Sequence, residues 1–406
     1  MKKKIVLAYS GGLDTSVILK WLIEKDYDVV AYIADIGQKE DFSAARKKAL
    51  AIGAKKVYVV DLKKEFVSDC IFTAIKANAV YEGKYLLGTS LARPLIAKGQ
   101  IEIARKEKTN IVAHGATGKG NDQVRFEVTY QMLMSDVEII SPWRDDEFLR
   151  DFEGRKDLIA YAIKHKIPVK ASVSKPYSID DNIMHTSFEA GQLEDPYLMP
   201  NKEMFEKTKA LEDTPDEPAK ICVEFKDGIP VSLTHDKKKF TDSLELFTYL
   251  NELAGLHGIG RVDLVENRFV GMKSRGVYET PAGTVLMAAH LDIEGLTMDR
   301  EVKLLRDSLS PKYASLIYNG LWYSPEFELL NAFMNKAQEY VTGKVNLKLF
   351  KGNVVIEGRS SNESLYNPNI ASMDKHGGYN QKDADGFIKL NVLRLKASAS
   401  RLIKRK

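Results

Sequence analysis

The sequence of 406 residues contains only two cysteines, Cys70 and Cys222, and they stand far apart. They form no CxxC pair, so the sequence indicates neither a zinc finger nor a redox-active disulfide. No apolar run approaches the roughly 18 residues that a membrane helix needs. The N-terminal MKKK leads directly into a predicted strand and lacks the small-residue cleavage site of a signal peptide. We therefore expect a cytoplasmic protein with reduced thiols and no membrane partner.

An excess of charge of either sign is also missing, since 60 basic and 56 acidic side chains leave a formal net charge of +4. This balance gives no reason to expect a nucleic-acid partner. The basic excess is local, because the stretch Lys389–Lys406 holds seven Lys or Arg and no acid. A solvated helix end explains such a tail, and contact with RNA or a membrane surface is the alternative.

Metal-ligand spacing is absent as well. His114, His185 and His290 have no such spacing to one another. We therefore expect no metal site built by a cluster of protein ligands.

The feature around which the chain is organised is the turn AYSGGLDTS, residues Ala8–Ser16. A buried strand is predicted over Lys4–Tyr9, and apolar residues recur at helical spacing from Leu13 to Leu22. Gly11 and Gly12 let the backbone turn without a Cβ clash, so its amides can point at one anion where the helix dipole already favours negative charge. Hydroxyl donors at the same end are supplied by Ser10, Thr15 and Ser16. The turn is predicted to bind phosphate, and a plain strand-to-helix turn with an Asp cap is the alternative.

The turn is neither a Walker A loop nor a GxGxxG dinucleotide site, because the required residues do not follow at the right spacing. Its SGGxDT pattern resembles the PP-loop of the ATP pyrophosphatases, which cut ATP between the α and β phosphates. In that reading Asp14 helps to hold Mg²⁺ against the phosphates, since this cation prefers carboxylate and phosphate oxygens.

The first part of the chain alternates strands and helices. Further strands are predicted at 29–34, 56–61, 111–114 and 138–141, and helical sequence, including 63–78, separates them. This alternation predicts an α/β fold with a doubly wound parallel sheet, in which ligands lie beyond the carboxyl ends of the strands. We assign residues 1–168 to a nucleotide-binding domain of PP-loop type.

The alternation is lost from about residue 169. Hairpins are predicted at 221–234 and 344–356, and helices at 243–256, around 282–289 and around 326–340. This pattern predicts an α+β domain over 169–359. Residues 360–406 are polar and irregular up to a basic helix near the end, and their few apolar residues are too sparse to fold alone. Composition therefore predicts an arm here rather than another core.

Four further stretches are rich in polar and charged residues, and three of them also contain glycine. In YLLGTSLARP, residues 85–94, Thr89 and Ser90 are predicted at a helix N-cap, with a simple cap as the alternative to a ligand contact. In HGATGKGNDQVRFE, residues 114–127, Asn121 and Arg125 share one helical face, which suits a small zwitterion; a solvated salt-bridge helix is the alternative. KPYSIDDNIMHTS, residues 175–187, is predicted to be a loop.

ENRFVGMKSRGVYETPAG, residues 266–283, combines three glycines with Glu266, Lys273, Arg275 and Tyr278. Its apolar Phe269, Val270 and Met272 predict a partly buried segment. A charged segment that packs inward is often a site, and a surface loop is the alternative.

Taken together, the stretches at Ala8, Tyr85, His114 and Glu266, with YIADIGQKEDF and HLDIEGLTMDRE, resemble the argininosuccinate synthases from Lys4 to about Leu402. The resemblance implies ligation of L-citrulline and L-aspartate through a citrullyl-adenylate, with ATP as co-substrate and Mg²⁺. It also implies a homotetramer, in which the C-terminal arm and helix serve oligomerisation.

The resemblance further implies residue roles. ATP contacts are implied for Ala8, Tyr9, Ser10, Gly11, Gly12, Leu13, Asp14, Thr15, Ser16, Ala34 and Gly115. Citrulline contacts are implied for Tyr85, Ser90, Asn121, Arg125, Ser178, Ser187, Glu266 and Tyr278. Aspartate contacts are implied for Thr117, Asn121 and Asp122. We expect the catalytic residues to be Ser10, Asp14, Asp122 and Arg125.

Two other functions share part of this pattern. Another PP-loop enzyme, such as a tRNA thiolase or a glutamine-fed synthetase, would need a reactive cysteine or a glutaminase nucleophile, and neither Cys70 in a helical run nor Cys222 in a strand fits. A non-catalytic ATP-binding regulator would explain the phosphate turn but not the polar residues that accompany Arg125 and Glu266.

Overall fold

The structure is a computed structural model that describes residues 2–118, 120–168, 177–373 and 378–403. The contacts divide the chain into two units, Met1–Glu363 and Ser364–Lys406. Lys175 and Pro176 of the expected loop, and residues 404–406 of the basic tail, lie outside the described residues.

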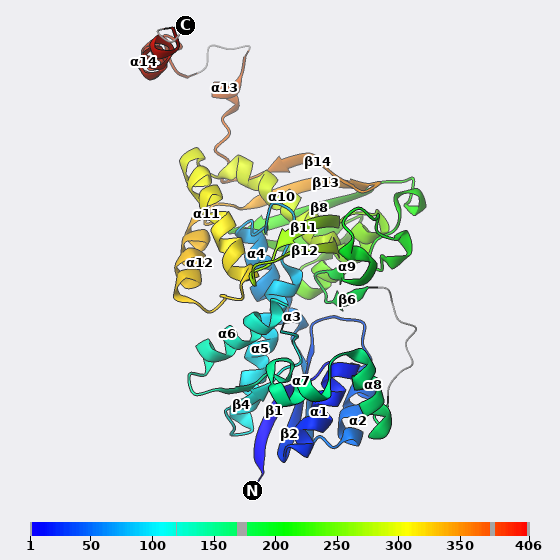
Figure 1. Cartoon of the computed structure of the whole chain (residues 1–406). Helices are drawn as coiled ribbons and strands as arrows, with labels where there is room; N and C mark the ends of the chain where they lie inside the picture. Colours follow the sequence, from blue (N-terminus) through cyan, green and yellow to red (C-terminus); the bar gives the residue numbers. More distant parts are fainter. Residues whose placement is uncertain (1, 119, 169–176, 374–377, 404–406) are drawn as a thin grey trace. The chain divides into compact units, whose positions relative to one another are not determined.

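The first unit contains a five-stranded parallel sheet with strand order β3-β2-β1-β4-β5 (Figure 1). Its strands are β1 (Lys3–Ala8), β2 (Tyr27–Asp35), β3 (Lys56–Asp61), β4 (Ile111–Ala113) and β5 (Glu138–Ile140). Its helices are α1 (Leu13–Glu24), α2 (Phe42–Ile52), α5 (Gly88–Lys106), α6 (Asp122–Leu133), α7 (Asp146–Asp151) and α8 (Arg155–Lys164), with a 3-10 turn at Pro142–Arg144. The predicted parallel sheet is confirmed.

Successive side chains of β1 belong to different buried clusters, and this shows that helices cover both faces of the sheet. Ile5 and Leu7 belong to a buried cluster that also holds residues of α1, α2 and α8. Val6 belongs to a second cluster, with residues of α5 and α6. Because successive side chains of a strand point to opposite faces, the two clusters lie on opposite sides of the sheet, as expected of a doubly wound fold.

Two antiparallel sheets follow. One has the strand order β10-β9-β8-β13-β14 and the other β11-β12-β7-β6. Their strands are β6 (Ser178–Asp181), β7 (Thr186–Glu189), β8 (Ala219–Lys226), β9 (Ile229–His235), β10 (Lys238–Phe240), β11 (Arg261–Asn267), β12 (Lys273–Glu279), β13 (Gly343–Phe350) and β14 (Asn353–Ser360). The helices here are α9 (Ser243–Leu256), α10 (Pro281–Thr297), α11 (Arg300–Tyr318) and α12 (Pro325–Ala337), with 3-10 turns at Gly191–Glu194, Lys202–Met204 and Leu211–Asp213. Both predicted hairpins are confirmed, and β8 pairs with β13 to join them.

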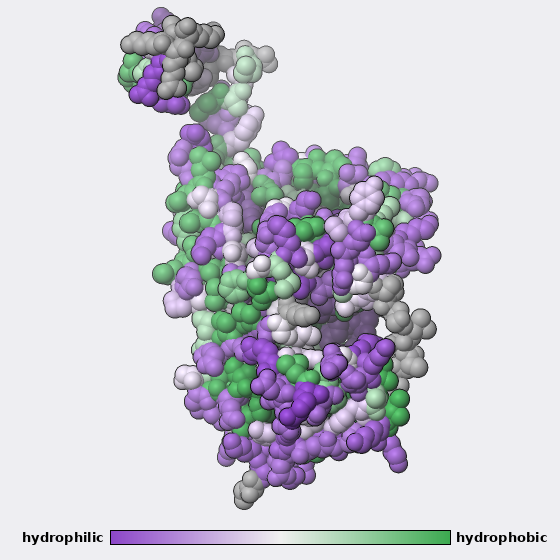
Figure 2. All heavy atoms as spheres, viewed as in Figure 1, coloured by the Kyte–Doolittle hydropathy of each residue, from purple (hydrophilic) through white to green (hydrophobic). Residues whose placement is uncertain are grey.

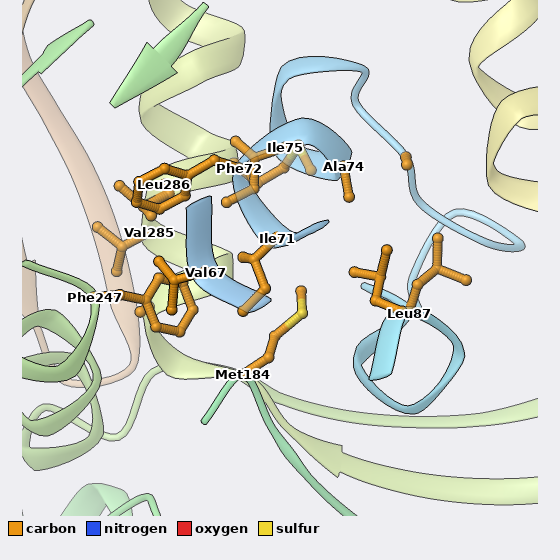
Figure 3. Close-up of a cluster of buried hydrophobic side chains, with 14 of the residues drawn as sticks. Val67, Ile71, Phe72, Ala74, Ile75, Leu87, Met184, Phe247, Val285 and Leu286 are labelled. Atoms are coloured by element: carbon orange, nitrogen blue, oxygen red, sulfur yellow. The ribbon is translucent and has the colours of Figure 1, made fainter. Parts of the chain in front are cut away.

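The largest hydrophobic core contains residues from the segment that forms the parallel sheet and from the segment that forms the two antiparallel sheets. Its helical contribution begins with the π-helical segment Phe66–Ile71, which follows α3 (Lys63–Glu65), and continues with α4 (Phe72–Lys76). Figure 3 shows Val67, Ile71 and Phe72 from this stretch beside Phe247 and Leu286. The residues after β3 are therefore packed together with those of α9 and α10. The 63–78 helix was predicted without its π-helical segment.

Three groups of elements depart from the sequence-based expectations. Residues 177–187 were expected to be a loop, yet they form β6, β7 and the link between them. The segment 266–283, expected to be partly buried with a surface loop as the alternative, supplies the end of β11, all of β12 and the start of α10. The long helix α11 was not predicted at all. Charged side chains interrupt the apolar pattern in two of these elements, through Asp180 and Asp181 in β6 and through the fully buried Arg306 in α11.

The second unit contains α13 (Pro368–Ala371) and α14 (Asp383–Ile403). The predicted basic helix near the end is confirmed as α14. Large apolar side chains of this helix, among them Phe387, Leu390 and Leu393, are 63–71% exposed. The unit therefore has no apolar core among its described residues.

Hydrophilic residues dominate the face of the first unit in Figure 2, with apolar residues in small groups. Leucines of α11 and α12, among them Leu304, Leu305 and Leu329, are exposed. Within the described ranges, no helix combines the length and apolar character that crossing a bilayer requires.

Candidate active site

The phosphate turn joins β1 to α1 as predicted. Gly11 has φ +77°, a backbone conformation that favours glycine, and a Cβ there would also lie 3.1 Å from Ala45 Cβ. The Ser10 and Thr15 hydroxyls lie 3.1 Å apart, and the Gly12 amide donates to Ser10 Oγ over 3.4 Å. Beneath the turn, Ser16 Oγ donates to the Gly12 carbonyl at 2.5 Å. The turn is thus a preformed cup of amides and hydroxyls at the start of a helix.

A cavity of about 390 Å³ opens beside this turn at the carboxyl edge of the parallel sheet. Its lining includes six of the residues predicted to contact ATP: Ala8, Tyr9, Ser10, Thr15, Ala34 and Gly115. The other five, Gly11, Gly12, Leu13, Asp14 and Ser16, belong to the same turn and helix start but are not part of the lining. We call this space the nucleotide cavity.

A second cavity of about 320 Å³ lies next to the first. It is lined by most of the residues predicted for the two amino acids: Tyr85, Thr117, Asn121, Asp122, Arg125, Ser187, Glu266 and Tyr278. We call it the amino-acid cavity. Ser90 and Ser178 do not line it, because Ser90 is fully buried in α5 and Ser178 is exposed at the start of β6.

The two cavities share part of their lining, which includes Arg93, Asp122 and Asp180. Arg93 Nε lies 2.8 Å from Asp122 Oδ2, and its Nη2 lies 2.8 Å from Asp180 Oδ2. Arg125 Nη1 lies 2.9 Å from the other oxygen of Asp122. A chain of alternating charges therefore crosses the seam between the cavities.

Sequence reasoning missed Arg93 and Asp180 as site residues. Arg93 is four residues after Thr89 in a stretch that was singled out, so helical spacing could have placed both on one face. Thr89 Oγ1 donates to Asp180 Oδ2 at 2.8 Å and lies 2.9 Å from His185 Nε2. Nothing local to residue 180 signals this role, because its partners come from α5.

The predicted N-cap role of Thr89 and Ser90 is wrong. Helix α5 begins at Gly88, and Leu87 stands at the N-cap position with φ +68° and no capping side chain. A Cβ at Gly88 would lie 2.4 Å from the His185 ring, so the close approach of His185 requires glycine at this position. Thr89 is consequently free to contact Asp180 from the first turn.

Glu266 and Tyr278 meet across the β11–β12 hairpin. Tyr278 Oη donates to Glu266 Oε2 at 3.0 Å, and the Tyr278 ring stacks on Tyr85 with centroids 4.4 Å apart. Arg275 points to another partner, Asp263, with Nη2 and Oδ2 2.7 Å apart. In the segment 266–283, the buried charged and polar side chains Glu266, Arg275 and Tyr278 therefore lie on the strands β11 and β12.

The segment is partly buried as predicted, through residues 275–279 of β12, but the apolar residues at the hairpin tip do not contribute to this burial. Phe269, Val270 and Met272 are 50%, 37% and 47% exposed. Gly271 between them has φ +92°, so the chain turns sharply at this point and leaves these side chains on the outside.

The electrostatics separate the carboxyl groups of the site. Burial alone would raise the Asp122 pKa, but Arg93 and Arg125 outweigh it and bring the pKa to about 2. Burial raises the pKa of Glu266 and of Asp14, and the charge of Arg155 opposes the rise at Asp14. Burial lowers the pKa of His185 to about 4, so this ring is neutral at pH 7. Because its pKa is about 2, Asp122 is ionised at neutral pH and is a poor general base.

Among the described residues, no three His, Cys, Asp or Glu side chains are grouped so that they could hold a metal ion. A hard cation at this site would need oxygen ligands from a bound phosphate in addition to a carboxylate such as Asp14.

Two family models match the chain. The model described as Arginosuccinate synthase N-terminal HUP domain matches residues 4–168, and that described as Arginosuccinate synthase C-terminal domain matches residues 177–398. An Argininosuccinate synthase from Thermotoga sp. (strain RQ2) is 59% identical over 398 residues, 98% of this chain and 97% of that protein. Those from Xenopus tropicalis and Mus musculus are 56% and 55% identical over 397 residues, 97% of this chain and 96% of each relative. The resemblance carried by the motifs is confirmed, and the chain belongs to the argininosuccinate synthase family of ligases.

Proposed function

We propose that the chain joins L-citrulline and L-aspartate at the expense of ATP, with ATP in the nucleotide cavity and both amino acids in the amino-acid cavity. The observation that supports this division is the seam shared by the two cavities. A phosphate at the edge of the first cavity would face a substrate group in the second across a shared lining of Arg93, Gly115, Ala116, Asp122 and Asp180. Such contact between two bound reactants is what in-line transfer requires.

The first step is attack of the citrulline ureido oxygen on the α-phosphorus of ATP. The bond to the β-phosphate bridging oxygen breaks, and pyrophosphate leaves into the cup formed by Ser10, Gly11, Gly12 and Thr15. Their amides and hydroxyls would stabilise its charge without reorganising. The product is citrullyl-adenylate.

In the second step the aspartate amine, as the free base, attacks the activated ureido carbon. A carbon–nitrogen bond forms and the carbon–oxygen bond to AMP breaks. The nitrogen, positively charged after the attack, gives one proton to the departing AMP phosphate. Asp122 and Thr117 are proposed to hold aspartate, with Asn121 shared between the two amino acids. Asp122, with its pKa near 2, orients the amine rather than accepting its proton.

Citrulline is proposed to be held as a zwitterion. Arg125 would bind its carboxylate and Glu266 its ammonium group, while Tyr85, Ser187 and Tyr278 line its side chain. The proposed contacts of Ser90 and Ser178 rest on the family resemblance alone, since neither lines the cavity.

Mg²⁺ is proposed to enter with ATP. The chemistry it supplies is neutralisation of charge on the phosphate oxygens. Asp14, in the first turn of α1, would hold the ion from the protein side, and a cation there would oppose the rise in its pKa that burial causes.

A sulfur-transferring PP-loop enzyme is the main alternative, and the cysteines do not support it. Burial raises the pKa of both thiols, and Cys70 is 5% exposed inside the largest core. A nucleophilic thiol would need the opposite shift and an open approach.

The proposed reaction is tested with citrulline labelled with ¹⁸O in the ureido group. The label should appear in AMP and not in pyrophosphate, and pyrophosphate exchange into ATP should occur with citrulline alone. Arginine, which has no ureido oxygen, is the matched control and should support no exchange. Unlabelled AMP formed alongside argininosuccinate would contradict the adenylate route, and label in pyrophosphate would mean attack at the β-phosphorus.

We further propose that the protein works in the cytoplasm as a homotetramer with domains over 1–168 and 169–359, and that residues 360–406 form an intersubunit arm. The exposed apolar side chains of α14 support the arm, because no described residue of their own unit buries them.

A further inference from the structure

Tyr318, the last residue of α11, contacts three residues of the amino-acid cavity without lining the cavity itself. Its hydroxyl donates to Glu266 Oε1 at 2.7 Å and accepts from Asn121 Nδ2 at 3.0 Å. Its backbone carbonyl accepts from Arg125 Nε at 2.8 Å. The side chain is 0% exposed, so these bonds are shielded from water.

The Tyr318 ring is held as firmly as its hydroxyl. It stacks on Tyr81 with centroids 3.7 Å apart and an interplanar angle of 6°. The Arg125 guanidinium lies over the same ring, 4.9 Å from its centre. Gly320, with φ +81°, lets the chain after the helix pass so close to Arg125 that a Cβ there would lie 2.6 Å from Arg125 Cα. The end of α11 is therefore packed directly against the start of α6.

The three partners come from distant parts of the chain. Asn121 and Arg125 begin α6, whereas Glu266 is on β11. We propose that Tyr318 is a positioning residue for citrulline, which sets the spacing between the cation and the carboxylate that hold the two charged groups of the substrate. This inference rests on the proposed function, because it takes the amino-acid cavity to be the citrulline site.

The two hydrogen bonds of the Tyr318 hydroxyl together set the orientation of the Asn121 side-chain amide. The single proton of the Tyr318 hydroxyl is given to Glu266, so the hydroxyl oxygen can only accept from Asn121. The Asn121 amide nitrogen therefore points at Tyr318, and its carbonyl oxygen points the other way, 3.4 Å from the Val270 amide. Burial raises the pKa of Tyr318 far above its usual value, so the proton stays on the hydroxyl at all working pH values. Loss of that one oxygen would remove one hydrogen bond from Glu266 and one from Asn121.

The charge of Glu266 is coupled to the same contact. Burial raises its pKa, while hydrogen bonds from the Tyr318 and Tyr278 hydroxyls oppose that rise. The titratable groups that face it are Arg125 from α6, Arg268 after β11, Tyr278 from β12, Tyr318 from α11 and, before α5, Tyr81 and Tyr85. Removing the Tyr318 hydroxyl removes a donor to the carboxylate, so the Glu266 pKa must rise further.

The test compares Tyr318→Phe with Tyr313→Phe. Tyr313 is on the same helix, is also 0% exposed, and its hydroxyl donates to Asn331 at 2.9 Å, away from both cavities. Each variant loses one buried hydroxyl and keeps its ring. Pyrophosphate release is measured against citrulline and ATP concentration over a range of pH, and thermal unfolding is measured in parallel.

Tyr318→Phe should raise the citrulline KM on the order of tenfold, the effect of losing a hydrogen bond to a charged group, and leave the ATP KM unchanged. The acid limb of kcat/KM for citrulline should move to higher pH, because citrulline binding needs ionised Glu266. Tyr313→Phe should show neither change. Equal effects in the two variants, or an unchanged citrulline KM in Tyr318→Phe, would overturn the inference.

A second variant guards against misfolding of the first. Tyr81→Leu removes the ring that stacks on Tyr318 from the outer side and should raise the citrulline KM in the same selective way. An unchanged citrulline KM in a folded Tyr81→Leu would also count against the inference. Failure of the proposed function would look different, since wild type and Tyr313→Phe would then release no pyrophosphate with citrulline.

Discussion

Ser10 and Asp14 represent the two kinds of group that the phosphate turn offers, a hydroxyl donor and a carboxylate. Ser10 is exposed at the mouth of the nucleotide cavity, and Asp14 lies in the first turn of α1. Neither side chain belongs to a hydrophobic core. Substitutions here should therefore report on chemistry rather than on folding.

We expect Ser10→Ala and Asp14→Asn each to slow adenylation on the order of 10² to 10³-fold, the effect of removing one oriented charge-stabilising group. Rates of pyrophosphate exchange with citrulline would be measured. Ser43→Ala, at an exposed position of α2, and Asp146→Asn, in the first turn of α7, are matched controls. Their rates of exchange should remain near that of the wild type. Near-normal exchange in both turn variants would remove the turn from the mechanism.

A buried charged residue explains why the sequence pattern did not predict the helix α11. Helix α11 contains Pro311 and the fully buried Arg306, which interrupt the apolar pattern expected of its inner face. Arg306 is tolerated there because both of its terminal nitrogens bind Glu294 of α10, one of them at 2.5 Å. Asn78, His290 and Gln338 complete a buried network around the same carboxylate.

This ion pair gives a stability prediction for the element pair α10 and α11. Arg306→Met should destabilise the first unit by about 3–5 kcal/mol, because it leaves the Glu294 carboxylate buried without its main partner. The midpoint of urea unfolding would measure the loss. Arg300→Met on the same helix, where the guanidinium is 84% exposed, should cause no measurable change.

A double variant separates a lost ion pair from a packing defect. Combining Arg306→Met with Glu294→Gln removes the uncompensated charge and should recover part of the stability. If the double variant is less stable than Arg306→Met alone, the cost comes from packing and not from charge.

At the scale of the whole molecule, the two units differ in how they bury apolar surface. The first unit holds every large buried cluster, whereas apolar side chains of α14 such as Leu390 are exposed within the chain. Exposed leucines on a regular helix are expected to be covered by another surface. A second copy of the chain is the partner proposed above.

Truncation before Asp383, which removes α14, should therefore lower the mass of the assembly measured by light scattering. Leu390→Ser with Leu393→Ser should act in the same direction, because it removes only apolar surface. Lys389→Ser with Lys396→Ser on the same helix is the control and should leave the mass unchanged. A tetramer that survives the truncation would exclude the arm as an intersubunit element.

The sequence alone predicted the parallel sheet and the phosphate turn, and its resemblance to a known family implied most of the candidate substrate contacts. The strands and the turn follow from short-range physics, since apolar period and glycine position act within a few residues of one another. Most of the named contacts line the two cavities because β1 and β4 are neighbours in the sheet and bring their following loops to one edge.

Only the tertiary structure decided which distant residues complete the site. Asp180 reaches Arg93 from a strand expected to be a loop, and Tyr318 reaches Arg125 from a helix with no clear apolar period. Such contacts depend on how whole elements pack, and each charged partner is buried only because another element neutralises it. No pattern within one stretch of sequence encodes that pairing, so Arg93, Asp180 and Tyr318 became visible as parts of the site only once the elements were packed together.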